Sequence, residues 1–166
     1  MDGERADTGQ HLTHLDHEGR ARMVDVGAKE ATERVARARA DVRMHSETLA
    51  RIRAGGVAKG DVLAVAQVAA IMGAKKTAEV IPLCHPIALT GIDVEFSYID
   101  DNVLRIEVRV RTVGQTGVEM EALTGCTVGA LTVYDMCKAI DRSMTIEGVA
   151  LLEKSGGKSG LYRRQN

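Results

Sequence analysis

Alternating hydrophobic and polar residues mark several strands along the chain. In 103–113, VLRIEVRVRTV, apolar residues occupy almost every second position, and most of the positions between them hold arginine or glutamate. This period of two predicts a strand with one buried face. Segment 89–99 precedes it across the turn at 100–102, so the two predict an antiparallel hairpin. Segments 36–44 and 144–155 alternate in the same way and predict two further strands.

Helices are predicted between these strands. Ser46 offers an N-terminal cap to a short helix that ends at Gly55. Asp61 offers a cap to segment 62–80, which is apolar on nearly all sides. This composition predicts a buried helix, and Gly73 is the position where we expect it to break.

A longer helix is predicted over 118–140, so the order of elements is strand, helix in pieces, strand, strand, helix, strand. This order is the split βαβ pattern of the ferredoxin-like fold. We therefore expect an α+β two-layer sandwich, with an antiparallel sheet covered by helices on one face. Residues 1–11 are expected to form a disordered arm, 12–154 a single domain and 155–166 a flexible basic tail.

Composition and charge narrow the class of protein. Hydrophobic residues make up 45% and charged residues 27%, as in soluble globular proteins, and a formal charge of −1 gives no general attraction to nucleic acid or to an anionic membrane. No apolar run approaches the roughly 20 residues of a membrane span. The three cysteines are widely spaced in a chain without a secretory signal, which predicts reduced thiols and a cytoplasmic protein.

Two charged residues interrupt the apolar segment GALTVYDMCKAI at 129–140. Asp135 and Lys138 are three residues apart, so on a helix their side chains share one face. One interpretation is a solvated ion pair on the outside, which contributes under about 1 kcal/mol. The other is a base and an acid paired in a cleft, and the apolar residues on the neighbouring stripe favour it because they place the pair near the core boundary.

Other polar residues also depart from the structural pattern. His85 lies in LCHP, where a catalytic role and the role of an ordinary loop residue both remain open. Glu119 and Glu121 begin the long helix, and they have either a functional role or only a favourable interaction with its macrodipole. Several lysines, one histidine and a few carboxylates are together what phosphate binding and general acid–base catalysis require. The lysines of interest are Lys59, Lys75, Lys76, Lys154 and Lys158.

The length of the predicted helix separates two of these candidates. Glu121 and Asp135 are fourteen residues apart, which corresponds to about 21 Å at 1.5 Å per residue. One small substrate cannot easily contact both ends of the helix within one subunit. If both residues act on it, the site lies between chains, and an obligate oligomer is expected.

Six motifs follow one another along the chain: THLDHEGRARMVDV, KGDVLAVAQVAAIMGAKKT, IPLCHP, TGVEMEALT, LTVYDMCKAI and KSGGKSG. Together they resemble the family of molybdenum cofactor biosynthesis protein C, the cyclic pyranopterin monophosphate synthases. The resemblance extends from about Leu12 to Gly160, which is nearly the whole chain.

The resemblance implies a lyase that converts 3′,8-cyclo-7,8-dihydroguanosine 5′-triphosphate into cyclic pyranopterin monophosphate and diphosphate. It implies that 12–154 is the catalytic domain of a homohexamer, a trimer of dimers with the site at a dimer interface. No cofactor is implied with certainty: the cysteine and histidine spacing gives no metal site, and whether Mg²⁺ accompanies the triphosphate is left open. The expected partners are this small nucleotide-derived substrate and further copies of the chain, with no nucleic acid and no membrane.

Matching the motifs residue by residue places the family's functional positions on this chain. The catalytic residues implied are Asp135, Lys138 and Lys59. The substrate-binding residues implied are Leu83, Cys84, His85, Met120, Glu121, Glu119, Lys75 and Lys154. Gly73 replaces the first alanine of the family's AAK, a small-for-small change on a packing face that leaves Lys75 in place.

The chemistry of the substrate then suggests a role for each group. Lys59, Lys75 and Lys154, with His17 and Arg20 from the N-terminal segment, are expected to hold the triphosphate. Asp135 and Lys138 are expected to act as base and acid, with partial burial and mutual charge moving both pKa values toward neutrality. His85 and Glu121 suit the amide and amino edge of the purine-derived ring.

One alternative comes from another class, a non-catalytic nucleotide- or RNA-binding module, since the same sandwich fold hosts both. RNA readers of this shape stack bases on aromatic side chains of the sheet. The predicted strands offer only Phe96 and Tyr98 for this purpose.

Overall fold

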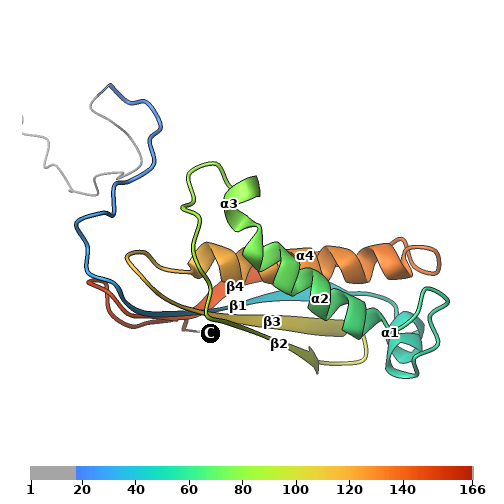
Figure 1. Cartoon of the computed structure of the whole chain (residues 1–166). Helices are drawn as coiled ribbons and strands as arrows, with labels where there is room; N and C mark the ends of the chain where they lie inside the picture. Colours follow the sequence, from blue (N-terminus) through green and yellow to red (C-terminus); the bar gives the residue numbers. More distant parts are fainter. Residues whose placement is uncertain (1–17, 166) are drawn as a thin grey trace, which may run out of the picture.

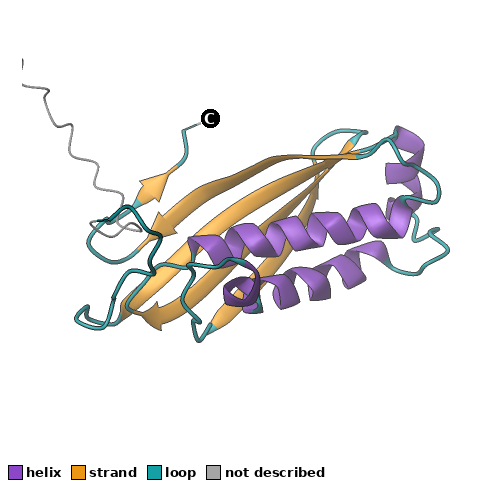
Figure 2. Cartoon of the chain, turned by 90° about the horizontal axis from the view of Figure 1, so that it is seen from above, coloured by secondary structure: helices purple, strands orange, loops and turns teal. Residues whose placement is uncertain are grey.

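An antiparallel sheet with a layer of helices on one face makes up this protein, which is described by a computed structural model over residues 18–165 (Figures 1 and 2). The elements are β1 (Thr32–Arg43), α1 (Ser46–Arg53), α2 (Val62–Lys75), α3 (Thr77–Val80), β2 (Gly91–Tyr98), β3 (Val103–Gly114), α4 (Glu119–Cys137), β4 (Thr145–Ser155) and β5 (Tyr162–Arg163).

The strand order confirms the ferredoxin-like prediction. The sheet runs β2-β3-β1-β4-β5, and every neighbouring pair is antiparallel. The first four strands have the order that a split βαβ pattern produces. β1 is central, and it begins four residues before the predicted start at Ala36. The segment predicted as a tail includes β5, which pairs with β4 through Glu153 and Lys154.

The core lies between the sheet and helices α2 and α4. Alternate residues of β1 and β3 point into it and are almost completely buried, as the period of two predicts. These residues are Ala36, Ala38, Ala40 and Val42 of β1, and Leu104, Ile106, Val108 and Val110 of β3. The core is aliphatic because the chain has no tryptophan and one phenylalanine.

Small residues allow α2 and α4 to pack closely. A Cβ atom added to Gly73 of α2 would lie 2.7 Å from the Cβ atom of Val128, and one added to Gly125 of α4 would lie 3.2 Å from the Ala70 carbonyl oxygen. The predicted break at Gly73 is therefore wrong, because this glycine is a contact between helices. The interruption comes at Lys76, between α2 and α3.

The prediction that segment 62–80 is buried on nearly all sides is also wrong for the single chain. α2 directs Ala66, Ala70, Gly73 and Ala74 toward α4 and the sheet, whereas several of its larger apolar residues lie on the opposite side. Val65, Val68 and Met72 share this outer face at helical spacing and are 45%, 58% and 52% exposed.

The two predicted helix caps have different outcomes. Asp61 caps α2, since its Oδ1 atom accepts a hydrogen bond from the backbone N–H of Ala64 at 3.0 Å. Ser46 is the first residue of α1 and not its cap. The cap position is His45, whose backbone N–H donates to the carboxylate of Asp141 at 2.8 Å.

Across residues 18–165, none of the helices is both long and apolar enough to cross a membrane.

Candidate active site

Helix α4 carries candidate residues at both of its ends. Glu119, Met120 and Glu121 form its first turn, whereas Asp135 lies in its last turn and Lys138 directly follows it. The single long helix that was predicted is confirmed, and with it the separation of about 21 Å between Glu121 and Asp135 along the helix. The candidate residues of α4 therefore form two groups, one at each end of the helix.

The C-terminal end of α4 holds a cluster of two amines and one carboxylate. The Nζ atom of Lys138 lies 2.6 Å from Oδ1 of Asp135. The Nζ atom of Lys59 lies 3.0 Å from Oδ2 of the same carboxylate and donates to the Asp135 carbonyl oxygen at 2.8 Å. The loop before α2 thus brings Lys59 to the predicted Asp135–Lys138 pair, and we call these three residues the acid–base cluster.

The acid–base cluster is exposed in the single chain, which corrects one prediction. The side chains of Asp135 and Lys138 are 56% and 52% exposed. Hydrogen bonds from Lys138 and Lys59, together with their positive charges, hold the pKa of Asp135 below its usual range. The predicted shift of the Asp135 pKa toward neutrality is therefore wrong for this chain, and Asp135 is a carboxylate at neutral pH.

The N-terminal end of α4 borders a cavity of about 530 Å³, which we call the histidine cavity. Its lining brings together Leu83, Cys84, His85, Glu119, Met120 and Glu121. The Nε2 atom of His85 lies 2.8 Å from the Val24 carbonyl oxygen. Because a carbonyl oxygen only accepts, Nε2 carries the proton in this contact and the neutral ring keeps Nδ1 as an acceptor.

Glu121 has an unusual environment in the histidine cavity. Its side chain is 3% exposed, and its buried Oε2 atom has no hydrogen-bond partner among the described residues. Desolvation raises the pKa of Glu121 to about 7, with a smaller contribution from the charge of Glu119. Burial, followed by the charge of Glu121, also raises the pKa of the Cys84 thiol. Cys84 is thus a neutral thiol and not a ready nucleophile.

A smaller cavity of about 340 Å³ adjoins the same residues. Lys75, at the end of α2, lines it together with His85 and Glu121. The structure therefore places Lys75 in the group at the N-terminal end of α4.

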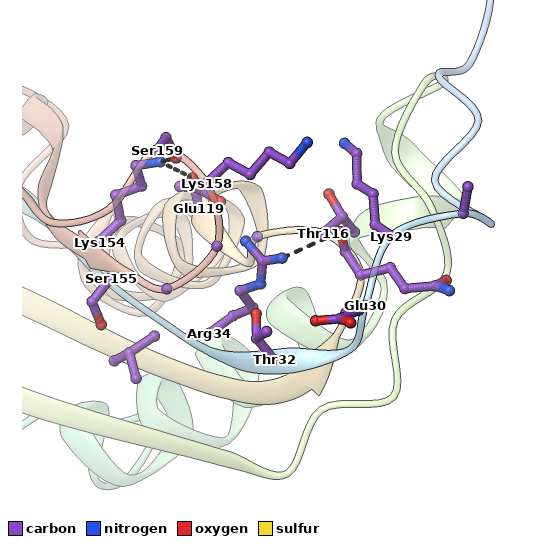
Figure 3. A pocket seen from close by; sticks show the side chains of 16 residues that line it. Lys29, Glu30, Thr32, Arg34, Thr116, Glu119, Lys154, Ser155, Lys158 and Ser159 are labelled. Atoms are coloured by element: carbon purple, nitrogen blue, oxygen red, sulfur yellow. Dashed lines mark hydrogen bonds and ion pairs between the residues drawn. The ribbon is translucent and has the colours of Figure 1, made fainter.

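A cavity of about 790 Å³ lies beside the glycine-rich loop at 155–159, and we call it the loop cavity (Figure 3). Lys154 lines it, donates to the hydroxyl of Ser159 and lies 3.7 Å from Oε1 of Glu119. Arg34 and Lys29 also line it. Sequence reasoning missed both. Arg34 lies just before the predicted strand start at Ala36, but it shares the face of β1 that carries the buried Ala36 and Ala38, and an arginine on this face was the available signal. No spacing links Lys29 to the loop.

Two candidates, Arg20 and His17, come from the N-terminal segment. Arg20 is exposed and pairs with Glu18 at 2.8 Å, and it lines none of the three cavities. His17 lies outside the described residues. Within 18–165, no group of three or more histidine, cysteine, aspartate or glutamate side chains is arranged to hold a metal ion.

The open face of the sheet is a ladder of charged residues. Arg105 makes a bidentate contact with Asp41 at 2.7 and 2.8 Å, and Arg111 pairs with Asp93 at 2.6 Å. Phe96 packs against the core on the other side, and the ring of Tyr98 lies 4.3 Å from the guanidinium of Arg53. The RNA-binding alternative thus loses the two aromatic side chains on which it depended.

Fold and site together define an α+β protein with a ferredoxin-like sheet, an acid–base cluster, and cavities lined by lysine, arginine, histidine and glutamate side chains. The model of the MoaC family matches residues 23–157. This match covers most of the chain, and the chain belongs to the MoaC family.

Several named relatives are similar in sequence to this chain over nearly their whole length. The cyclic pyranopterin monophosphate synthase of Desulfitobacterium hafniense is 60% identical over 155 residues, which are 93% of this chain and 95% of the relative. The protein of that name from Pelotomaculum thermopropionicum is 62% identical over 155 residues, 93% of this chain and 91% of the relative. The one from Thermomicrobium roseum is 60% identical over 156 residues, 93% and 94% of the two chains.

Proposed function

We propose that this chain is a lyase with cyclic pyranopterin monophosphate synthase activity in molybdenum cofactor biosynthesis. Its substrate is 3′,8-cyclo-7,8-dihydroguanosine 5′-triphosphate, and its products are cyclic pyranopterin monophosphate and diphosphate. The observation that carries the proposal is the acid–base cluster, in which one carboxylate lies 3.0 and 2.6 Å from two amines within a chain of the MoaC family.

The acid–base cluster supplies groups that move protons during ring opening and reclosure. Asp135 is ionised at neutral pH and accepts a proton from a ring nitrogen or hydroxyl. Lys138 and Lys59 are amines within hydrogen-bond distance of Asp135, so one of them donates a proton to the departing nitrogen or oxygen while the other keeps the carboxylate oriented.

The histidine cavity binds the purine-derived ring in this proposal. Glu121, with a pKa of about 7, is present in both protonation states near neutral pH. It can accept a hydrogen bond from an amino group or donate one to a ring oxygen, which also satisfies its unpaired Oε2 atom. His85 offers Nδ1 as an acceptor, and Leu83, Cys84 and Met120 form the less polar wall.

Cations from several segments hold the triphosphate. Lys154 in the loop cavity and Lys75 beside Glu121 lie near the ring site. Lys59 contributes from the acid–base cluster, and His17 and Arg20 contribute from the N-terminal segment. Charge-assisted hydrogen bonds of this kind neutralise both the bound triphosphate and the diphosphate that leaves.

The active protein is an oligomer whose site combines residues of two chains. Within one chain the acid–base cluster and Glu121 stand at opposite ends of α4, about 21 Å apart along the helix. The outer face of α2 presents Val65, Val68 and Met72, and such an apolar patch is typical of a contact between subunits. A hexamer formed by three dimers, with the site at the dimer interface, meets both requirements. We place this enzyme in the cytoplasm, where its three free cysteines remain reduced.

A coupled assay tests the activity. The purified protein is incubated with the upstream radical enzyme that makes the substrate, and the product is oxidised to a fluorescent pterin and measured. Lys138→Ala should lower the rate at least a hundredfold, because general acid–base catalysis typically contributes that much. Arg51→Ala, at an exposed position of α1, is the matched control and should keep its activity. An active Lys138→Ala enzyme would refute the acid–base role.

A further inference from the structure

The acid–base cluster combines two segments that are distant in the sequence. Asp135 and Lys138 belong to the end of α4, whereas Lys59 lies in the loop between α1 and α2, 76 residues before Asp135. The side chains of Lys59 and Asp135 are both about half exposed, 47% and 56%. An exposed ion pair contributes little by itself, so the 3.0 Å contact between them requires that the loop be held in place by other interactions.

The loop that carries Lys59 is held on one side by α2, which packs on α4, and on the other side by α1. Two backbone hydrogen bonds, at 3.1 and 2.9 Å, connect residues 55 and 56 back to the last turn of α1. Val57 packs in the core, and its carbonyl oxygen accepts from the N–H of Gly60 at 3.0 Å. Lys59 lies in the turn that this bond closes, so its position depends on the position of α1.

Asp141 connects α1 to the end of α4. It lies in the turn that follows α4, its side chain is fully buried, and its backbone N–H donates to the carbonyl oxygen of Cys137 at 3.0 Å. One carboxylate oxygen accepts from the N–H of His45 at 2.8 Å and the hydroxyl of Thr48 at 3.2 Å, both at the start of α1. The other oxygen accepts from the N–H and the hydroxyl of Ser143 at 2.9 and 2.7 Å.

These four hydrogen bonds occupy the acceptor positions of a carboxylate. Asp141 therefore has no remaining acceptor for a substrate, and its burial keeps substrate away from it. Its place in the molecule is nevertheless close to the acid–base cluster. Figure 1 shows α1 and the start of α2 at the same end of the molecule as the turn that follows α4.

The electrostatics of Cys137 also place Asp141 and Lys59 near one another. Cys137 is the last residue of α4, and its thiol is buried. Burial raises the pKa of this thiol, the charge of Asp141 raises it further, and the charge of Lys59 acts in the opposite direction. Both charges thus act on one side chain at the end of α4, with Asp141 on the buried side and Lys59 on the exposed side.

We propose that Asp141 is a positioning residue of the acid–base cluster, which sets the distance between Lys59 and Asp135 by holding α1 against the end of α4. This inference rests on the proposed function, in which the cluster moves protons. Asp141 acts through Lys59 and not through Lys138. The contact between Lys138 and Asp135 spans three residues at the end of one helix and does not depend on α1.

NMR of the lysine ammonium groups tests the positioning at neutral pH without requiring catalysis. The ammonium of Lys59 donates to the Asp135 carbonyl oxygen at 2.8 Å and to its carboxylate at 3.0 Å, so its protons should exchange slowly enough to give a signal. Asp141→Asn should abolish the signal of Lys59 and keep that of Lys138. Asp101→Asn, at an 88% exposed side chain, is the matched control and should keep both.

A double-mutant cycle in the coupled assay tests the effect on catalysis. Asp141→Asn should lower kcat at least about tenfold, because a displaced catalytic group costs that much or more. In a Lys59→Ala protein, Asp141→Asn should change kcat by less than about twofold, since the group through which it acts is already absent. A purely structural role of Asp141 would instead give losses that multiply.

Thr48→Val keeps the proposal testable if Asp141→Asn does not fold. It removes one donor to Asp141 from the α1 side and leaves the charge unchanged, so it should weaken the Lys59 signal and lower kcat to a smaller degree.

Specific outcomes overturn the proposal. They are an absent Lys59 signal in wild type, an unchanged Lys59 signal in folded Asp141→Asn and Thr48→Val, loss of the Lys138 signal together with that of Lys59, and multiplying losses in the double variant. The two measurements also separate this proposal from the activity. Product formation with a Lys59 signal that does not depend on Asp141 would reject the positioning role and keep the enzyme. An Asp141-dependent signal in a protein that forms no product would keep the structural link and reject the activity.

Discussion

At the scale of single residues, two carboxylates of one helix differ because their surroundings differ. Asp135 is exposed between two amines, and its pKa is lowered. Glu121 is buried with an unpaired oxygen, and its pKa is raised to about 7. At neutral pH the first is a base, and the second is divided between its charged and neutral forms. Environments that push two pKa values apart are how enzymes assign such roles.

Glu121→Gln should change how stability depends on pH. The folded protein holds the Glu121 proton up to a pKa of about 7, whereas the unfolded chain releases it near 4.5. The stability that this residue contributes is therefore present below pH 4.5 and is lost as the pH rises through about 7. The neutral glutamine does not titrate. The free energy of unfolding of the variant, relative to that of wild type, should therefore increase by up to about 3 kcal/mol between pH 4.5 and 8.

Urea denaturation at fixed protein concentration measures this difference. Glu33→Gln, at an exposed position of β1, is the control for the loss of one carboxylate. If the difference in stability between Glu121→Gln and wild type is the same at pH 4.5 and at pH 8, Glu121 does not titrate as its burial indicates.

Some residues of the site follow from the sequence and others do not. Asp135 and Lys138 are neighbours because a helix brings positions three apart together, so their contact was predictable. Lys59 lies 76 residues before Asp135, and only the packing of α2 on α4 brings it within 3.0 Å. Arg34 was not predicted because it lies before the expected strand start at Ala36, although it shares the face of β1 that carries the buried Ala36 and Ala38.

At the scale of elements, α1 is held in place by a residue that is distant in the sequence. Asp141, buried after α4, accepts from the backbone N–H of His45 at 2.8 Å and the hydroxyl of Thr48 at 3.2 Å. It also accepts from the backbone N–H and hydroxyl of Ser143 at 2.9 and 2.7 Å. Desolvation acts to raise the pKa of Asp141, but the hydrogen bonds from His45 and Ser143 outweigh it and lower the pKa.

Asp141→Asn should destabilise the protein by about 2 kcal/mol near neutral pH, because an amide cannot accept all of these bonds and brings a donor of its own. A depressed pKa contributes stability that is present above the unfolded pKa of 3.8 and is lost as the pH falls through the folded value. The difference between wild type and variant should therefore shrink below pH 3.8.

Chemical denaturation at pH 7 and pH 3 measures both effects. Asp101→Asn replaces a side chain that is 88% exposed and is the matched control. Equal stability of Asp141→Asn and Asp101→Asn at pH 7 would contradict the inference that hydrogen bonds of Asp141 hold α1 to the end of α4.

The strands were easier to predict than the limits of the helices. Alternation in 103–113 defines β3 almost to the residue, because a half-buried strand requires it. Helix interruptions and caps depend on distant partners. Gly73 lies inside α2, where Val128 occupies the space that a side chain would need. The start of α1 is held by Asp141, which lies 96 residues after His45 in the sequence. No local pattern carries this information.

At the scale of the whole molecule, a single chain keeps apart two residues that the proposed reaction requires. α4 holds Asp135 and Glu121 at opposite ends, and the rigidity of a continuous helix keeps them apart. An antiparallel arrangement of two such chains would bring the acid–base cluster of one near the histidine cavity of the other. The exposed apolar face of α2 offers the kind of surface that stabilises such an assembly.

Mixing two inactive variants tests whether the site is shared. Glu121→Ala and Asp135→Ala should each be inactive alone, because every site of either oligomer lacks one required group. After subunits exchange, some sites combine an intact Glu121 from one chain with an intact Asp135 from the other, so activity should return to roughly a quarter of wild type for random pairing in a two-chain site. Exchange is followed independently by mass spectrometry of differently tagged chains. Proven exchange without recovered activity would mean that both residues act within one chain, which the length of α4 makes difficult to reconcile with a single small substrate.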